Sequence, residues 1–120
     1  MSDAPELDLT LHRSEAADVV RVAGELDMAN VDRLGRAVDS ASASHVVLDL
    51  EGLSYLDSAA IRAIDGAFRR LAESGRTLAV VASHGSRAAW TFRVAGFGEG
   101  LVVESVEAAI AARPLGAADG

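Results

Sequence analysis

The chain contains no cysteine and no lysine, and these two absences exclude several kinds of chemistry. Without cysteine there is no disulfide framework and no thiolate nucleophile. Without lysine there is no P-loop lysine, no Schiff base and no pyridoxal-phosphate site, because each of these needs the primary amine. The basic residues, eleven in number, are therefore all arginine.

Long hydrophobic runs are also lacking, although half of the residues are hydrophobic. No apolar stretch approaches the roughly 20 residues that cross a bilayer, so we expect no membrane partner. The acidic start of the chain, residues 1–6, lacks the basic and apolar regions of a secretory signal. Together with the missing cysteines, these features predict a cytoplasmic protein.

The charge balance is acidic, with 18 Asp and Glu against 11 basic residues and a net charge of −7. Binding to nucleic acid needs a basic surface, so nucleic acid is not an expected partner. An acidic domain associates readily with a basic patch on another protein. The charge therefore favours a protein partner.

The length of 120 residues is sufficient for one domain with a single core. No repeat or linker divides the chain, so we expect one domain at residues 6–112. A flexible N-terminus (1–5) and a flexible C-terminal tail (113–120) flank it. Strand patterns alternate with helix patterns along the domain. This order predicts an α/β fold, a mixed, mostly parallel sheet of about five strands covered by about four helices.

Alternating or continuous apolar residues mark the expected strands, at 7–11, 19–24, 46–50, 77–82 and 101–103. The first two are expected to pair as a hairpin. Side chains that can accept a hydrogen bond from a first-turn N–H group mark the helix starts, at Asn30, Asp57, Ser86 and Ser105. Residues 51–56 are predicted to connect the third strand to the second helix. That helix is expected to bury Ile61, Ile64, Phe68 and Leu71.

Asp57 and Ser58 stand at the start of the second predicted helix. If Asp57 caps this helix, Ser58 lies in the first turn with its hydroxyl outward. Free N–H groups and the positive end of the helix dipole converge there. A serine in that position is well placed to carry a phosphate. Asp-Ser before a helix is also ordinary capping chemistry, and these two residues alone leave both interpretations open.

A polar stripe continues along the same helix, with Ser58, Arg62, Asp65 and Arg69 at helical spacing. One interpretation is a solvated face held by an Asp65–Arg69 ion pair, which contributes little by itself. The other is a docking surface with Ser58 at its tip. Trp90, on the third predicted helix, is similarly either a contact residue or a side chain covered by the chain end.

The sequence predicts no catalytic residue, no cofactor and no metal site, and hence a protein that is not an enzyme. Ser58 lacks the G-x-S-x-G surroundings of a hydrolase nucleophile. The histidines His12, His45 and His84 lack metal-ligand spacing, which places them at the surface or at strand ends. The glycine-rich residues 96–100 follow a helix and precede a strand, the reverse of a pyrophosphate loop.

Three segments carry a resemblance to a known family. They are Gly24-Glu25-Leu26-Asp27, the buried strand followed by Asp57-Ser58, and Phe92-Arg93-Val94-Ala95-Gly96-Phe97. In this order and spacing the chain, from about Leu7 to Ala112, resembles the STAS-domain family. Within that family it is most similar to the single-domain anti-sigma-factor antagonists. The resemblance implies a STAS-type sheet.

Antagonists of this family bind a serine-kinase anti-sigma factor and so release the sigma factor that it holds. The kinase phosphorylates a serine in a D-S-(S/T)-G segment, which ends the interaction, and a serine phosphatase restores it. The resemblance implies that Ser58 is the phosphorylated residue, with Asp57 as its capping neighbour. Ala59 and Ala60 replace the family's Ser/Thr and Gly. The expected partner-binding residues are Asp27, Asp57, Ser58, Ala59, Arg62, Asp65 and Arg69.

Two alternatives remain beside this interpretation. The first is a STAS subunit of a lipid-transport or sensory scaffold complex, in which Ser58 is never phosphorylated. The second is a small enzyme or nucleotide-binding domain, for which the sequence offers no phosphate loop, metal motif or catalytic base. The residues leave the oligomeric state open.

Overall fold

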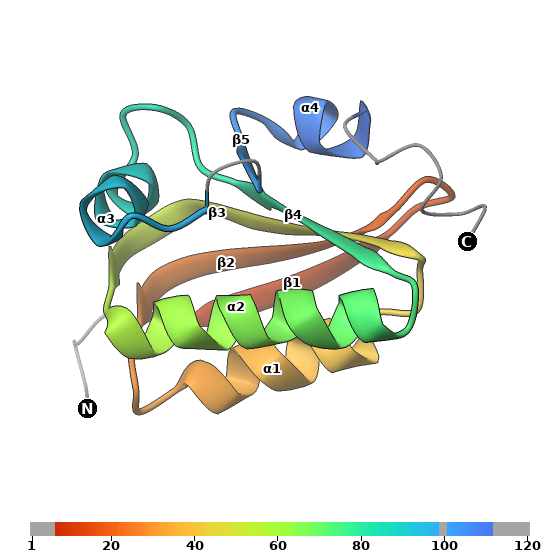
Figure 1. The fold of residues 1–120 in the computed structure, drawn as a ribbon, viewed down its shortest axis with the longest axis horizontal. Helices are drawn as coiled ribbons and strands as arrows, with labels where there is room; N and C mark the ends of the chain where they lie inside the picture. Colours follow the sequence, from red (N-terminus) through yellow and green to blue (C-terminus); the bar gives the residue numbers. More distant parts are fainter. Residues whose placement is uncertain (1–6, 99–100, 112–120) are drawn as a thin grey trace.

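The computed structural model describes residues 7–98 and 101–111, and Figure 1 shows the arrangement of the elements. The predicted flexible ends, residues 1–5 and 113–120, lie outside the described residues. Along the chain the elements are β1 (Asp8–Arg13), β2 (Asp18–Leu26), α1 (Val31–Ser40), β3 (His45–Leu56), α2 (Ser58–Glu73), β4 (Thr77–Val81), α3 (Arg87–Ala95), β5 (Val102–Val103) and α4 (Val106–Ala111).

The described strands form one five-stranded sheet in the order β1-β2-β3-β4-β5. β1 pairs with β2 as the predicted antiparallel hairpin, and the remaining neighbours pair in parallel. Each parallel connection contains a helix, as crossover connections require. The predicted fold class, a mixed and mostly parallel sheet with helices, is therefore confirmed.

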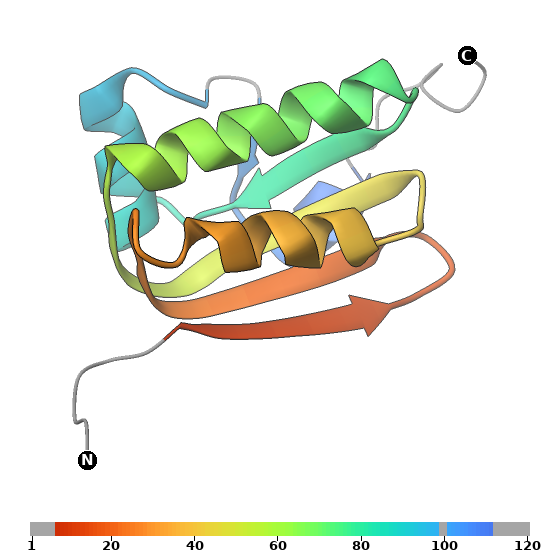
Figure 2. The ribbon, with the colours of Figure 1, turned by 90° about the horizontal axis from the view of Figure 1, so that it is seen from below.

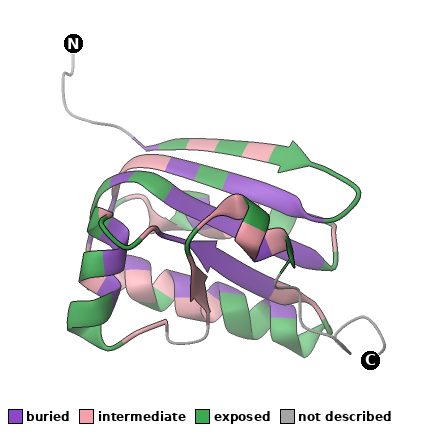
Figure 3. Cartoon of the chain, turned by 90° about the horizontal axis from the view of Figure 1, so that it is seen from above, coloured by how far each residue is buried: buried purple, intermediate pink, exposed green. Residues whose placement is uncertain are grey.

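The helices lie on both faces of the sheet. α1 and α2 lie side by side on one face, and α4 lies on the other (Figures 1 and 2). Buried residues concentrate on β2, β3 and β4, whereas β1 alternates half-buried and exposed side chains (Figure 3). The main core lies between the sheet and α1, α2 and α3, and a smaller apolar cluster lies under α4.

His45 attaches α4 to the sheet. It is the first residue of β3 and is only 1% exposed. Its Nε2 lies 2.9 Å from the carbonyl oxygen of Ala109, and its Nδ1 lies 2.6 Å from the hydroxyl of Thr77. Because a carbonyl oxygen only accepts, Nε2 carries the hydrogen. The strand-end prediction is correct for His45, and His12 and His84 are exposed as expected.

β2 and β3 are both longer than predicted. We expected them to end at Gly24 and Leu50, but they end at Leu26 and Leu56. The prediction of a connector at 51–56 is wrong because these residues continue to pair in parallel with β2. Two register shifts interrupt the pairing, and each shift breaks the period-two pattern by which a strand is recognised in a sequence.

The buried face of α2 is rotated from the predicted one. Its fully buried residues are Ala60, Ile64, Ala67 and Leu71. Phe68 is 40% exposed, so its assignment is wrong, whereas Ile61 is half-buried and packs against the main core. The alanines present small side chains to the sheet, so the helix can pack closely on it.

Two glycines allow the close approach of β2 and β3 to be tested against a helix position that has more space. A Cβ on Gly52 of β3 would lie 2.8 Å from the Cβ of Ala23 on β2, whereas a Cβ on Gly66 of α2 would lie 3.5 Å from its nearest neighbour, an Arg70 nitrogen. We expect Gly52→Ala to lower the free energy of unfolding by about 1–3 kcal/mol, because β2 and β3 must separate.

We expect Gly66→Ala to raise the free energy of unfolding by about 0.5–1 kcal/mol, because alanine favours a helix interior. Urea denaturation of both variants measures these changes. A Gly52→Ala variant as stable as the unchanged protein would contradict the close approach of the two strands.

Candidate functional site

The carboxyl ends of β2 and β3 bring two loops to the same edge of the sheet (Figures 1 and 2). The strands run in parallel, and their last residues, Leu26 and Leu56, pair with each other. Asp27 and Asp57 directly follow these paired residues, so the two aspartates emerge side by side. In open α/β sheets this edge is where ligands bind.

Both carboxylate oxygens of Asp57 accept hydrogen bonds from the backbone. Oδ1 accepts from the N–H group of Ala60 at 3.0 Å, which confirms the predicted cap of α2. Oδ2 accepts from the N–H group of Met28 at 3.2 Å, in the loop between β2 and α1. Asp57 therefore starts one helix and also holds the neighbouring loop.

Asn30 occupies the N-cap position of α1, but its side chain does not cap that helix as predicted. Its Oδ1 accepts from the N–H group of Asp27 at 2.9 Å, and its Nδ2 donates to the carbonyl oxygen of Glu25 at 3.0 Å. The backbone turns tightly here, because the N–H groups of Asn30 and Val31 both donate to the carbonyl of Asp27. The side chain is thereby used to close the loop.

Asp27 lies in this loop and is half-buried. Its Oδ1 accepts from the N–H group of Ala29 at 3.0 Å. The carboxylates of Asp27 and Asp57 are thus both bonded to backbone groups, and neither is matched by a basic side chain in the described residues. Two negative charges therefore stand at fixed positions beside the start of α2.

Ser58 is the first residue of α2, and it is exposed. Within the described part of the chain its hydroxyl makes no hydrogen bond to another protein group. Because Asp57 is the cap, Ser58 lies in the turn whose N–H groups lack helical partners. The predicted position of the serine, in the first turn and open to solvent, is confirmed.

The polar stripe continues along α2 as predicted. Arg69 donates from Nε to Oδ2 of Asp65 at 2.9 Å. This hydrogen bond and the charge of Asp65 raise the pKa of Arg69 above its ordinary value. Arg62 is exposed and forms no ion pair with any described residue. Ala59 is half-buried beside Ser58.

The structure therefore places the predicted site residues in two groups. Asp27, Asp57, Ser58 and Ala59 lie together at the sheet edge. Arg62, Asp65 and Arg69 extend from there along the exposed side of α2.

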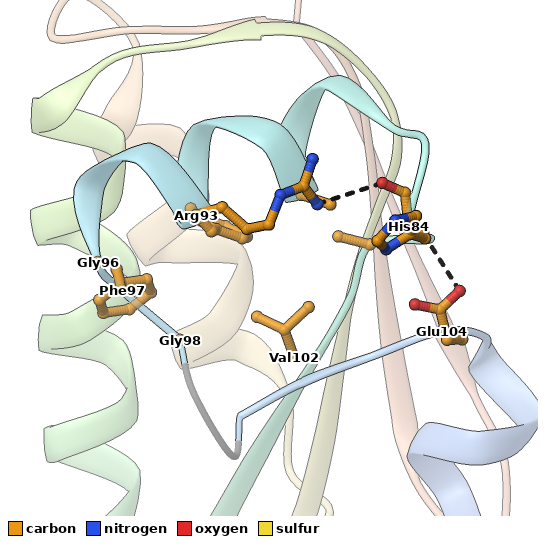
Figure 4. Close-up of a pocket in the computed structure, with 10 residues that line it drawn as sticks. His84, Arg93, Gly96, Phe97, Gly98, Val102 and Glu104 are labelled. Atoms are coloured by element: carbon orange, nitrogen blue, oxygen red, sulfur yellow. Dashed lines mark hydrogen bonds between the residues drawn. The ribbon is translucent and has the colours of Figure 1, made fainter.

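A cavity of about 400 Å³ that was not predicted lies where α3 faces the ends of β4 and β5. None of the predicted site residues lines it. Its apolar lining includes Phe92, Phe97 and Val102. His84, Arg93 and Glu104 supply polar side chains to the same cavity (Figure 4). Gly96 ends α3 in the left-handed conformation, which turns the chain out of the helix. In the sequence, the only indication of this cavity is the pair Phe92 and Phe97, which lie on either side of Gly96. Their rings lie 5.4 Å apart in the structure.

Trp90 on α3 is 51% exposed, and the guanidinium of Arg87 lies 5.3 Å from its ring. The alternative, that the chain end covers Trp90, involves residues outside the described ones. Among the residues that the structure describes, no three His, Asp or Glu side chains gather as a metal site would need. None of the described helices has the length and hydrophobicity to cross a bilayer.

The sequence model of the STAS domain family matches residues 9–109. The structure is similar to that of an anti-sigma factor antagonist from Mycobacterium paratuberculosis, with a TM-score of 0.76 and 20% identity over 90% of this chain and 94% of that chain. It is also similar to the Bacillus cell fate determinant SpoIIAA in its phosphorylated form, with a TM-score of 0.66 and 21% identity over 88% of this chain and 98% of that chain.

A third similar structure is the murine Solute Carrier 26 family member A9 anion transporter, with a TM-score of 0.65 and 17% identity. That similarity covers 91% of this chain but 19% of the transporter. At such identities, the likenesses establish a shared fold. A comparison with curated protein sequences finds no match.

The double role of Asp57 yields a testable prediction. Asp57→Ala removes the cap of α2 and the bond to the loop, so we expect the free energy of unfolding to fall by about 1–2 kcal/mol. Hydrogen exchange should also become faster at the amide of Met28, which loses its acceptor. Ser86→Ala is the matched control, because Ser86 caps α3 through the N–H group of Ala89 and otherwise donates to the carbonyl oxygen of Ser83, so it forms no bond to Met28. Unchanged exchange at Met28 in the Asp57 variant would contradict the bridging role.

Proposed function

Because the chain belongs to the STAS domain family, we propose that it is an anti-sigma factor antagonist. In this proposal it binds a serine-kinase anti-sigma factor, and phosphorylation of Ser58 ends the binding. The supporting observation is the exposed hydroxyl of Ser58, held at the start of α2 by the Asp57 cap. The similar structure from Mycobacterium paratuberculosis, which is named an anti-sigma factor antagonist, supports the same class of function.

A phosphate on Ser58 is compatible with the fold. It adds about −1.5 to −2 charges at neutral pH, at a helix end whose dipole and free N–H groups favour negative charge. Ser58 is exposed, so no core residue has to move. The domain therefore keeps its structure when it is modified.

The same phosphate is unfavourable for a bound partner. Asp27 and Asp57 are held by backbone hydrogen bonds, so their charges stay in place beside the new one. A partner surface that accepts a neutral hydroxyl would then meet like charge and would have to desolvate a dianion. The switch acts on the complex, and a serine phosphatase reverses it.

The residues after Ser58 determine the backbone conformation in which the kinase meets this serine. Ala60 is fully buried, and its N–H group is bonded to Asp57. Ala59 and Ala60 favour the helix, where the family pattern has a more flexible Ser/Thr-Gly pair. In this proposal the kinase accepts Ser58 with the first turn of α2 already formed, and the chain is a substrate with no catalytic group of its own.

Phosphorylation of Ser58 is the direct test. We expect intact-mass analysis to show one added phosphate when the chain is incubated with its cognate anti-sigma kinase and ATP. Ser58→Ala should abolish this addition, because the acceptor hydroxyl is gone. Ser54→Ala is the matched control, since Ser54 is also exposed and lies nearby at the end of β3. Continued labelling of the Ser58→Ala variant would refute the assignment.

The same reaction tests the switch. We expect phosphorylation to weaken binding to the kinase by about 100-fold or more in titration calorimetry, because like charges in an interface cost several kcal/mol. A phosphorylated chain that binds as tightly as the unmodified chain would contradict the switch. The alternative, an unphosphorylated STAS subunit of a lipid-transport or sensory scaffold complex, instead predicts an unlabelled chain that binds purified subunits of such a complex.

A further inference from the structure

A groove of about 550 Å³ lies between α1 and α2, which run side by side on one face of the sheet (Figure 2). Gly35 of α1 and Gly66 of α2 both line it. The nearest atoms to Cβ positions built on them belong to the guanidinium of Arg70, at 4.0 and 3.5 Å. The two missing side chains therefore leave space between the helices, to which a segment of another protein has access.

Three arginines line this groove: Arg36 from α1, and Arg62 and Arg70 from α2. Arg70 donates to Asp39 at 3.4 Å in an exposed ion pair. Arg36 and Arg62 make no hydrogen bond or ion pair with any described residue. Their guanidinium groups have all of their donors available, in the planar arrangement that matches a carboxylate.

The helix layer also differs in charge from the remainder of the protein. α1 and α2 together contain five arginines and four acidic residues, whereas the remainder of the chain contains six arginines and fourteen acidic residues. The acidic side chains of Asp32 and Asp39 still line the groove beside the arginines. This mixture disfavours a polyanion such as nucleic acid and suits a protein segment with separate carboxylates.

We propose that the groove between α1 and α2 binds an acidic segment of the anti-sigma factor, with its carboxylates paired to Arg36 and Arg62. This inference rests on the proposed function, because it concerns the same partner. Arg62 connects the two surfaces, since it lines the groove and lies one helical turn from Ser58. A partner positioned over Ser58 therefore reaches the groove without leaving the protein surface.

The test compares two arginines on one helix. Arg36 lines the groove, whereas Arg33 is exposed on α1 but does not line it. Binding of the unphosphorylated chain to the purified kinase is measured by titration calorimetry at physiological salt, where distant charges are screened. We expect Arg36→Glu to weaken binding about tenfold or more and Arg33→Glu to weaken it less than about threefold.

A second variant tests the space in the groove without changing charge. Gly35→Leu places an apolar side chain where Gly35 has only the Arg70 guanidinium nearby, so α1 should still fold. We expect this variant to unfold at a temperature no lower than the unchanged protein and to bind the kinase about tenfold more weakly. Gly35→Ala is its control and should bind nearly as well as the unchanged chain.

Different results would contradict binding of the acidic segment in the groove and binding of the kinase itself. Equal binding by the Arg36→Glu and Arg33→Glu variants, with the unchanged chain still binding and still released by phosphorylation, would overturn the groove alone. An unchanged chain that does not bind the kinase would overturn the proposed function and with it the occupant of the groove.

Discussion

The carboxylate of Asp57 is the interaction on which the arrangement of the site depends. One oxygen accepts from Ala60 and defines the first turn of α2, and the other accepts from Met28 and fixes the adjacent loop. A single side chain thus sets the position of Ser58 relative to Asp27. Since both oxygens are occupied by backbone donors, Asp57 contributes a fixed negative charge to the surface.

The parallel pairing of β2 and β3 places Asp57 next to the loop that follows β2, so that its carboxylate can reach the N–H group of Met28. Two register shifts let the strands continue to their paired ends, and the lack of a side chain at Gly52 allows β3 to approach Ala23 closely. Successive crossovers then place α1 and α2 beside each other on the same face. The result is an acidic edge with an adjoining helix layer that carries the arginines, and the two meet between Ser58 and Arg62.

The features predicted best from the sequence are those determined by residues within about four positions of each other, such as helix caps. The caps Asp57 and Ser86 were predicted correctly because each signal is local. The full length of β3 and the buried face of α2 depend on what lies opposite them, and both were predicted incorrectly. The position of Ser58 was predicted from its cap, whereas Arg36 was missed because the groove exists only once two helices are placed together.

In the proposed complex, the distance of each residue of α2 from Ser58 determines how strongly a phosphate there acts on the acidic edge and on the groove between α1 and α2. At 1.5 Å per residue, Arg62 lies about 6 Å along the helix axis from Ser58 and Arg70 about 18 Å. Charges are screened over about 8 Å at physiological salt. A phosphate on Ser58 therefore acts strongly at the acidic edge and weakly at the far end of the groove. In the proposed complex the acidic edge then provides the switch. Arg62 lies within the screening length and responds to the state of Ser58, whereas the end of the groove at Arg70 contributes affinity that depends little on it.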